Sequence, residues 1–274
     1  LSSNTQPRGK MASSRGRLHN ASFWMLTALC AVAPLLLGGV PDWTVWFTAV
    51  PLGFLSLSQS FRSPQKLSTW LLVPAALTLY YAIQLIPMPI SLLEVLSPQS
   101  ALWAMDVGLT VAPLSLNPYE TQLSMLVQFC FVTALFLGRL VSTSQVRYLV
   151  GWIAFSAAAV SLIGWLHMIF DWQLVMGFYQ AQDVNHPQGF VTSFINSNTC
   201  AGFLCLGVAA SFGLTLEQGK PLLMRLGLSS AYLCAAGVVM TQSKSGLLAL
   251  LFICSCWVYS LYLNPKFYKI RAYL

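Results

Sequence analysis

Long stretches without a charged residue constrain this chain more than any other feature. Eight apolar runs approach or reach the length of about 20 residues that a helix needs to cross a bilayer core of about 30 Å. They cover residues 21–40, 43–57, 68–86, 122–138, 148–170, 193–216, 226–241 and 246–263. Only 8% of the residues are charged, against about a quarter in soluble domains. The sequence therefore predicts an all-α polytopic membrane protein with about eight transmembrane helices.

The apolar runs form one block, and polar tails flank it. Residues 1–20 are polar and basic, which predicts a disordered tail. Residues 21–264 are interrupted by no internal repeat, low-complexity tract or domain-scale linker, so they predict a single membrane domain. Residues 265–274 form a second short basic tail.

The charges between the runs predict which way the chain is threaded. If the eight runs all cross, 13 of the 14 Lys and Arg residues fall on one side and six of the seven acids fall on the other. Loops rich in Lys and Arg stay in the cytoplasm, so both termini are expected there. The net charge of +7 then reflects membrane orientation, and we do not expect nucleic-acid binding.

Two external loops are longer than a turn requires. Residues 87–121 contain short apolar pieces broken by Pro98 and by acids, which favours an interfacial helix or a re-entrant hairpin over a crossing. Residues 171–192 mix aromatic and polar groups and include His186. The seven cysteines all fall inside apolar runs, without the spacing of a metal site, and are interpreted as packing residues.

Lys244 is the one cation that is not on the expected cytoplasmic side, because it lies near the expected external surface between the last two spans. An isolated charge at a span boundary is costly and is a candidate for function, here the binding of an anionic lipid-linked phosphate. The alternative is that the side chain extends to the headgroups and has no specific role.

A polar cluster over residues 193–199 marks the entrance of the sixth span. Asn196 and Asn198 are two residues apart and cannot share a helix face, so at least one is expected in a turn or a cap. Its amide would be available to a substrate or to the backbone. Simple capping of the helix is the more common alternative.

The remaining candidates for chemistry are histidines. His167 lies near the end of the fifth span and His186 lies in the second long loop, and each is a weak candidate for a catalytic base. No acid lies inside a span, which counts against a proton-coupled transporter.

Four stretches, in order, resemble the O-antigen ligase-related membrane glycosyltransferases, which include O-antigen ligases, O-antigen polymerases and protein O-oligosaccharyltransferases. They are residues 84–98, PLSLNPYETQLSMLVQF at 113–129, TSFINSNTCAGFL at 192–204 and MTQSKSGLLALL at 240–251. The block with Phe-x-Asn-x-Asn-x-x-Ala is the most specific of the four.

The resemblance implies a helical glycosyltransferase of the bacterial inner membrane. It implies transfer of a glycan from undecaprenyl pyrophosphate to a lipid A core, polymer or protein acceptor at the periplasmic face, without a metal or another cofactor. Lys244 stands where the family usually has an Arg that holds the pyrophosphate, and Ser197 stands where many members have a basic residue. Lys244, Asn196, Asn198 and Ser243 are therefore the candidate substrate-binding residues.

The resemblance also implies a longer protein, since family members have about twelve spans and a large periplasmic loop that supplies a catalytic His. This chain stops at Leu274, so the resemblance predicts a fragment or an inactive member unless His186 or His167 substitutes. Two other functional classes remain open: a transporter or flippase of lipid-linked glycans, which needs a polar cavity with cations facing both leaflets, and a non-catalytic membrane scaffold.

Overall fold

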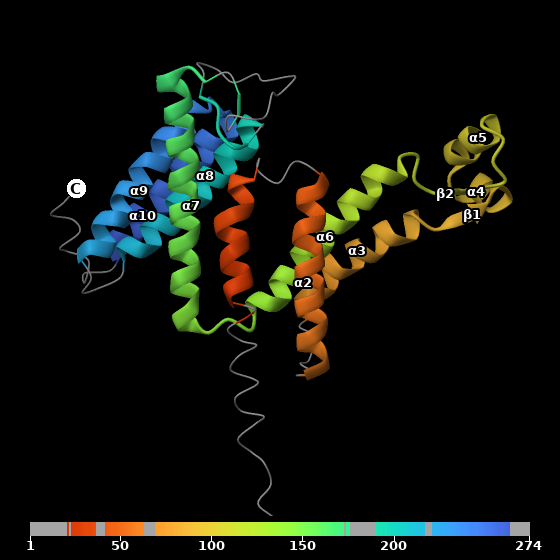
Figure 1. Cartoon of the computed structure of the whole chain (residues 1–274), viewed down its shortest axis with the longest axis horizontal. Helices are drawn as coiled ribbons and strands as arrows, with labels where there is room; N and C mark the ends of the chain where they lie inside the picture. The colour runs from red at the N-terminus through yellow and green to blue at the C-terminus, as the bar shows by residue number, and fades with distance from the viewer. Residues whose placement is uncertain are drawn as a thin grey trace, which may run out of the picture. The chain divides into compact units, whose positions relative to one another are not determined.

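A computed structural model describes residues 21, 23–36, 42–62, 69–172, 174–175, 190–194, 196–216 and 221–263, and 83% of these residues are helical (Figure 1). The chain divides into two compact units. The first comprises Leu1–Phe23 and Asp42–Val141, and the second comprises Trp24–Pro41 and Ser142–Leu274. Both tails, the sixth-span residue Ile195 and the predicted base His186 lie outside the described residues.

Three helices make up most of the first unit. They are α2 (Asp42–Arg62), α3 (Leu72–Gln84), which a 3-10 turn η3 (Thr69–Leu71) precedes, and α6 (Pro118–Gly138). Helix α6 packs against both α2 and α3. The side chain of Gln128 on α6 donates to the carbonyl of Pro74 on α3 at 3.3 Å. Most large side chains of these helices face outward, so the unit buries little of its apolar surface.

A small extension joins α3 to α6 within the first unit. Strands β1 (Pro87–Pro89) and β2 (Val111–Pro113) pair in antiparallel register, with Met88 opposite Ala112. Between them lie α4 (Ile90–Leu96) and α5 (Pro98–Asp106), of seven and nine residues. Leu93, Ala101, Ala104 and Ala112 form a separate core. The two helices are far too short to cross a bilayer, as the sequence predicted for this loop.

The second unit is a bundle of four long helices that lie side by side in Figure 1: α7 (Thr143–Phe170), α8 (Ser197–Thr215), α9 (Pro221–Met240) and α10 (Lys244–Leu263). Helix α8 packs against the other three. Gly207 on α8 lies directly against Ala157 on α7, and Gly237 on α9 lies against Ser161 on α7. Small residues at these crossings let the backbones approach closely, as is typical of helices that associate in membranes.

Helices α7 and α9 run in one direction and α8 and α10 in the other. Pairs of contacts fix these directions. Helix α8 is antiparallel to α7, because Gly207 meets Ala157 and Gly213 meets Val150, and α8 is parallel to α10, because Ala201 meets Gly246 and Phe212 stacks on Trp257. Two hydrogen bonds tie α7 to α9: the Ser161 hydroxyl donates to the Leu233 carbonyl at 2.7 Å, and the Ser230 hydroxyl donates to the Ala154 carbonyl at 3.1 Å. One end of the bundle therefore collects the first turns of α8 and α10.

Five of the eight predicted spans correspond to helices long and apolar enough to cross a membrane, namely α6 to α10, so the chain is a multi-pass helical membrane protein by length and composition. The other three predicted spans are helical but differ. Residues 21–40 and 68–86 contain the shorter apolar helices Phe23–Leu35 and Leu72–Gln84. The third, α2, has 21 residues but includes Asp42 at its start and the polar stretch SLSQS near its end.

Candidate functional site

The two sequence blocks at 192–204 and 240–251 meet at one end of the second unit. The Ser243 hydroxyl donates to the side-chain oxygen of Asn198 at 2.7 Å, although 45 positions separate the two residues. Close by, the Cys205 thiol donates to the Gly246 carbonyl at 3.4 Å. These contacts hold the first turns of α8 and α10 next to each other, so all four candidate binding residues come from one small region.

Asn196 is the N-cap of α8. Its side-chain oxygen accepts hydrogen bonds from the backbone N–H groups of Asn198 at 2.8 Å and Thr199 at 3.3 Å. The capping interpretation of the polar cluster is therefore confirmed for Asn196. Asn198 lies inside the first helical turn, and its side chain is the one that reaches across to α10.

Ser243 is the centre of the hydrogen-bond network at the start of α10. It is only 3% exposed, and its hydroxyl oxygen accepts from the backbone N–H of Gly246 at 3.1 Å. Its own N–H donates to the Thr241 hydroxyl at 3.3 Å. A hydroxyl has a single proton, which Ser243 gives to Asn198, so the Ser245 hydroxyl at 3.1 Å is the donor in the Ser243–Ser245 contact.

Lys244 is the first residue of α10 and is exposed. The N-terminus of a helix carries a partial positive charge, where a cation costs roughly 0.3–1 kcal/mol and an anion gains as much. The ammonium group and the first N–H groups of α10 therefore favour the same occupant, an anion.

Buried polar groups support the loop that leads into α8. The Thr192 hydroxyl donates to the Cys200 sulfur at 3.2 Å and accepts from the Phe194 N–H at 3.1 Å. The Ser193 hydroxyl donates to the Pro34 carbonyl at 2.6 Å. These groups serve the fold of the loop. The sequence analysis did not single out Thr192 or Thr241, although both lie in the two blocks that it identified.

His167 lies near the C-terminal end of α7 and is only 1% exposed. Its ring packs edge-on against Trp172 with the ring centroids 5.2 Å apart, and the Trp172 N–H donates to the His167 carbonyl at 3.3 Å. Asp171 between them adopts a left-handed conformation with φ 47° and is exposed. His167 is therefore an interior residue at the end of α7, beside an aromatic side chain.

The cysteines form no disulfide in the structure, and Cys200, Cys205 and Cys234 belong to the hydrophobic core of the second unit. All seven cysteines are free, with Cys200, Cys205 and Cys234 buried and Cys256 exposed. Within the described parts of the chain, no group of three or more His, Cys, Asp or Glu side chains is arranged to hold a metal ion.

Comparison with protein-family models, with curated proteins and with solved structures finds no match to this chain. The functional argument therefore rests on the residues and contacts described above.

Proposed function

We propose that this chain is an O-antigen ligase-like glycosyltransferase that moves a glycan from undecaprenyl pyrophosphate to a lipid A core, polymer or protein acceptor. The observation that carries the proposal is the hydrogen bond between Asn198 and Ser243. It brings together the two sequence blocks on which the family resemblance chiefly depends, and it does so beside Lys244.

The proposed role of this end of the bundle is to hold the pyrophosphate of the donor. The Lys244 ammonium supplies a point charge, and the first backbone N–H groups of α10 supply directed donors. In glycosyl transfer the acceptor hydroxyl attacks the anomeric carbon while the bond to the pyrophosphate breaks, so negative charge grows on the leaving phosphate. A cation held at that oxygen lowers the barrier to bond breaking. The acceptor proton goes to a base, for which His167 and His186 are the candidates in this chain.

The proposal includes a topology. It places eight spans in the bacterial inner membrane, both termini in the cytoplasm and Lys244 at the periplasmic face. The positions of the cations support this topology. Arg139 lies at the C-terminal end of α6, and Arg147 and Arg225 lie near the N-terminal ends of α7 and α9. Lys244 lies at the start of α10. Because α9 and α10 are antiparallel neighbours, Arg225 and Lys244 belong to opposite ends of the bundle.

The test is substitution of Lys244 in the full-length protein, expressed in a host that lacks its own ligase. We expect Lys244→Ala to lower glycan transfer by about tenfold to a hundredfold, the size of a lost hydrogen bond to a charged group. Lys244→Arg keeps the charge and should retain transfer. The readout is the amount of glycan attached to the acceptor, measured on gels and by mass spectrometry.

Arg225→Ala is the matched control, because it removes an exposed cation from the opposite end of the same bundle. It should leave transfer unchanged. Transfer at the normal rate by Lys244→Ala, with the variant present in the membrane at the normal level, would refute the assigned role. Labelling of a Lys244→Cys variant by an impermeant maleimide from the cytoplasmic side alone would refute the topology.

A further inference from the structure

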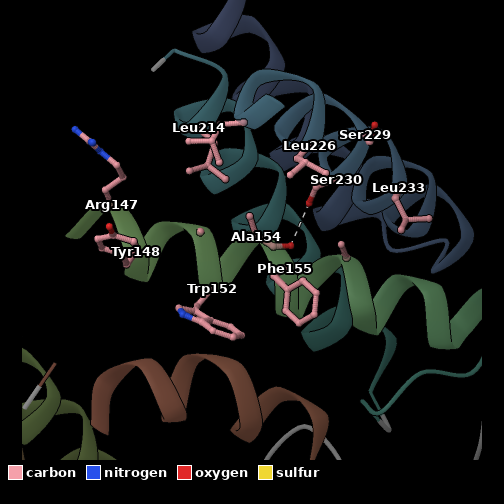
Figure 2. A pocket seen from close by; sticks show the side chains of 13 residues that line it. Arg147, Tyr148, Trp152, Ala154, Phe155, Leu214, Leu226, Ser229, Ser230 and Leu233 are labelled. Carbon is pink, nitrogen blue, oxygen red and sulfur yellow. Dashed lines mark hydrogen bonds between the residues drawn. The ribbon is translucent and has the colours of Figure 1, made fainter. Parts of the chain in front are cut away.

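An apolar groove runs along the outside of the second unit between α7 and α9, and Leu214 of α8 contributes to its lining. The cavity measures about 590 Å³. Figure 2 shows Leu226 and Leu233 of α9 on one side and Trp152 and Phe155 of α7 on the other. This volume is within the range of about 300–1,000 Å³ that is typical of small-molecule sites.

Small residues on α7 create the groove. Gly151, Ala154 and Ala158 line it, and with Arg147 they repeat at intervals of four, three and four positions, so they lie on one face of the helix. A Cβ atom added to Gly151 would meet nothing within 4 Å, which identifies open space at this point. Two serines of α9, Ser229 and Ser230, also line the groove, and the Ser230 hydroxyl already donates to the Ala154 carbonyl. Most of the other lining side chains are apolar. The walls therefore offer hydrocarbon contact to an occupant.

The length of the groove corresponds to one leaflet. Arg147 and Ala158 are eleven positions apart, which is about 16 Å along a helix at 1.5 Å per residue. Half of a bilayer core of about 30 Å is about 15 Å. An occupant that fills the groove from end to end thus matches the acyl chain of a lipid in a single leaflet.

Arg147 lies at one end of the groove, beside Tyr148, and Figure 2 shows its side chain extending outward from α7 there. A guanidinium group at the headgroup level, at the mouth of an apolar groove one leaflet long, complements an anionic lipid. We propose that this groove binds an anionic phospholipid, with one acyl chain between α7 and α9 and the phosphate on Arg147. The site lies at the opposite end of the bundle from Lys244 and does not depend on the proposed glycan transfer.

The test uses the full-length protein in phosphatidylcholine vesicles that contain a small fraction of phosphatidylglycerol with a photoreactive acyl chain. Mass spectrometry then maps the labelled peptides. We expect labelling to concentrate on residues 148–158 of α7 and 223–233 of α9. Unlabelled phosphatidylglycerol should displace the probe about fivefold better than phosphatidylcholine, the effect of one basic residue near the surface.

Two variants test the two parts of the site separately. Gly151→Leu should fill the groove and abolish its labelling, whereas Gly202→Leu, at another open position on α8, should not. Arg147→Gln should remove the preference for phosphatidylglycerol, whereas Arg225→Gln, an exposed cation outside the groove, should keep it. The proposal fails if labelling is even over the lipid-facing helices, if both lipids displace the probe equally, or if cross-linking finds another segment or a second copy in the groove.

Discussion

The two units of this chain differ in how closely their apolar helices pack against one another. In the second unit, half of the apolar window of α8 is buried, whereas the corresponding figure for α6 in the first unit is 11%. Both helices are apolar and of similar length, so composition does not explain the difference. The number of neighbouring helices does differ, because α8 packs against three helices of its unit and α6 against two, and α10 at the edge of the second unit is only 17% buried. The residues at the crossings differ too: glycine, alanine and serine face one another in the second unit, and a phenylalanine ring faces Gly53 in the first.

Close backbone approach also brings hydroxyl groups within reach of carbonyls on a neighbouring helix. The second unit uses this in the bonds from Ser161 and Ser230, and in the link from Ser211 to Ser230 at 2.9 Å. In the described part of the first unit, the Thr48 hydroxyl lies 3.7 Å from the Cys130 sulfur on α6, and Gln128 donates to the Pro74 carbonyl at 3.3 Å. The second unit therefore has the more closely packed helix crossings, whereas most large apolar side chains of the first unit are exposed.

The largest expected effect comes from Gly207→Ala. The new Cβ would overlap that of Ala157, a short side chain that cannot move aside, so we expect a loss of about 1–3 kcal/mol in the free energy of unfolding. Gly202→Ala, on an open face of the same helix, should cost nothing. Denaturant unfolding in detergent micelles, followed by circular dichroism, measures both. Equal stability of the two variants would remove the basis of the comparison.

A smaller effect is expected from Ser161→Ala, which deletes the hydrogen bond from α7 to the Leu233 carbonyl. Hydrogen bonds between membrane helices contribute about 1 kcal/mol. Ser255→Ala is the control, because its exposed hydroxyl bonds only to the Leu251 carbonyl of its own helix. The same unfolding measurement should separate the two variants. If both lose the same stability, the contact between helices contributes nothing of its own.

The smallest effect is expected from Gly53→Ala in the first unit. The new Cβ would come 3.1 Å from the edge of the Phe129 ring, and a ring at the end of a rotatable side chain can shift by a few tenths of an ångström. We expect a loss below about 1 kcal/mol, less than for Gly207→Ala. Hydrogen exchange of α2 and α6 peptides checks this locally. A loss as large as that of Gly207→Ala would show that the first unit is packed as rigidly as the second.

The sequence predicted the fold best where apolar runs are long and bounded by strong caps. The predicted starts of α6 and α7 were residues 122 and 148, whereas the helices begin at Pro118 and Thr143. Asn117 caps α6, and Ser142 forms a capping box with Gln145 at the start of α7. These signals are local and readable from the sequence. The extent of α3 was not predicted, because the apolar run 68–86 does not distinguish the helix from the 3-10 turn η3 before it or from Leu85 and Ile86 after it.

The candidate site was predicted in part. Asn196, Asn198, Ser243 and Lys244 were identified as separate candidates, but their meeting depends on α8 and α10 being parallel and adjacent, which no local pattern encodes. The interior position of His167 was also open, since periodicity is weak in a helix that is apolar on every side. The groove beside Gly151 could not be anticipated, because an absence of side-chain volume is visible only once the neighbouring helix is placed.

The Ser243 hydroxyl can donate only one hydrogen bond, and this limit affects the binding of an anion at this end of the bundle. The side-chain oxygen of Asn198 accepts this hydrogen bond, and the oxygen of a bound anion would compete for it. If the Ser243 hydroxyl donates to the anion instead, the carboxamide of Asn198 loses its hydrogen-bond donor and can rotate to present its NH2 group to the anion. Binding of an anion at the start of α10 would then change the orientation of one side-chain amide on α8, without movement of either helix.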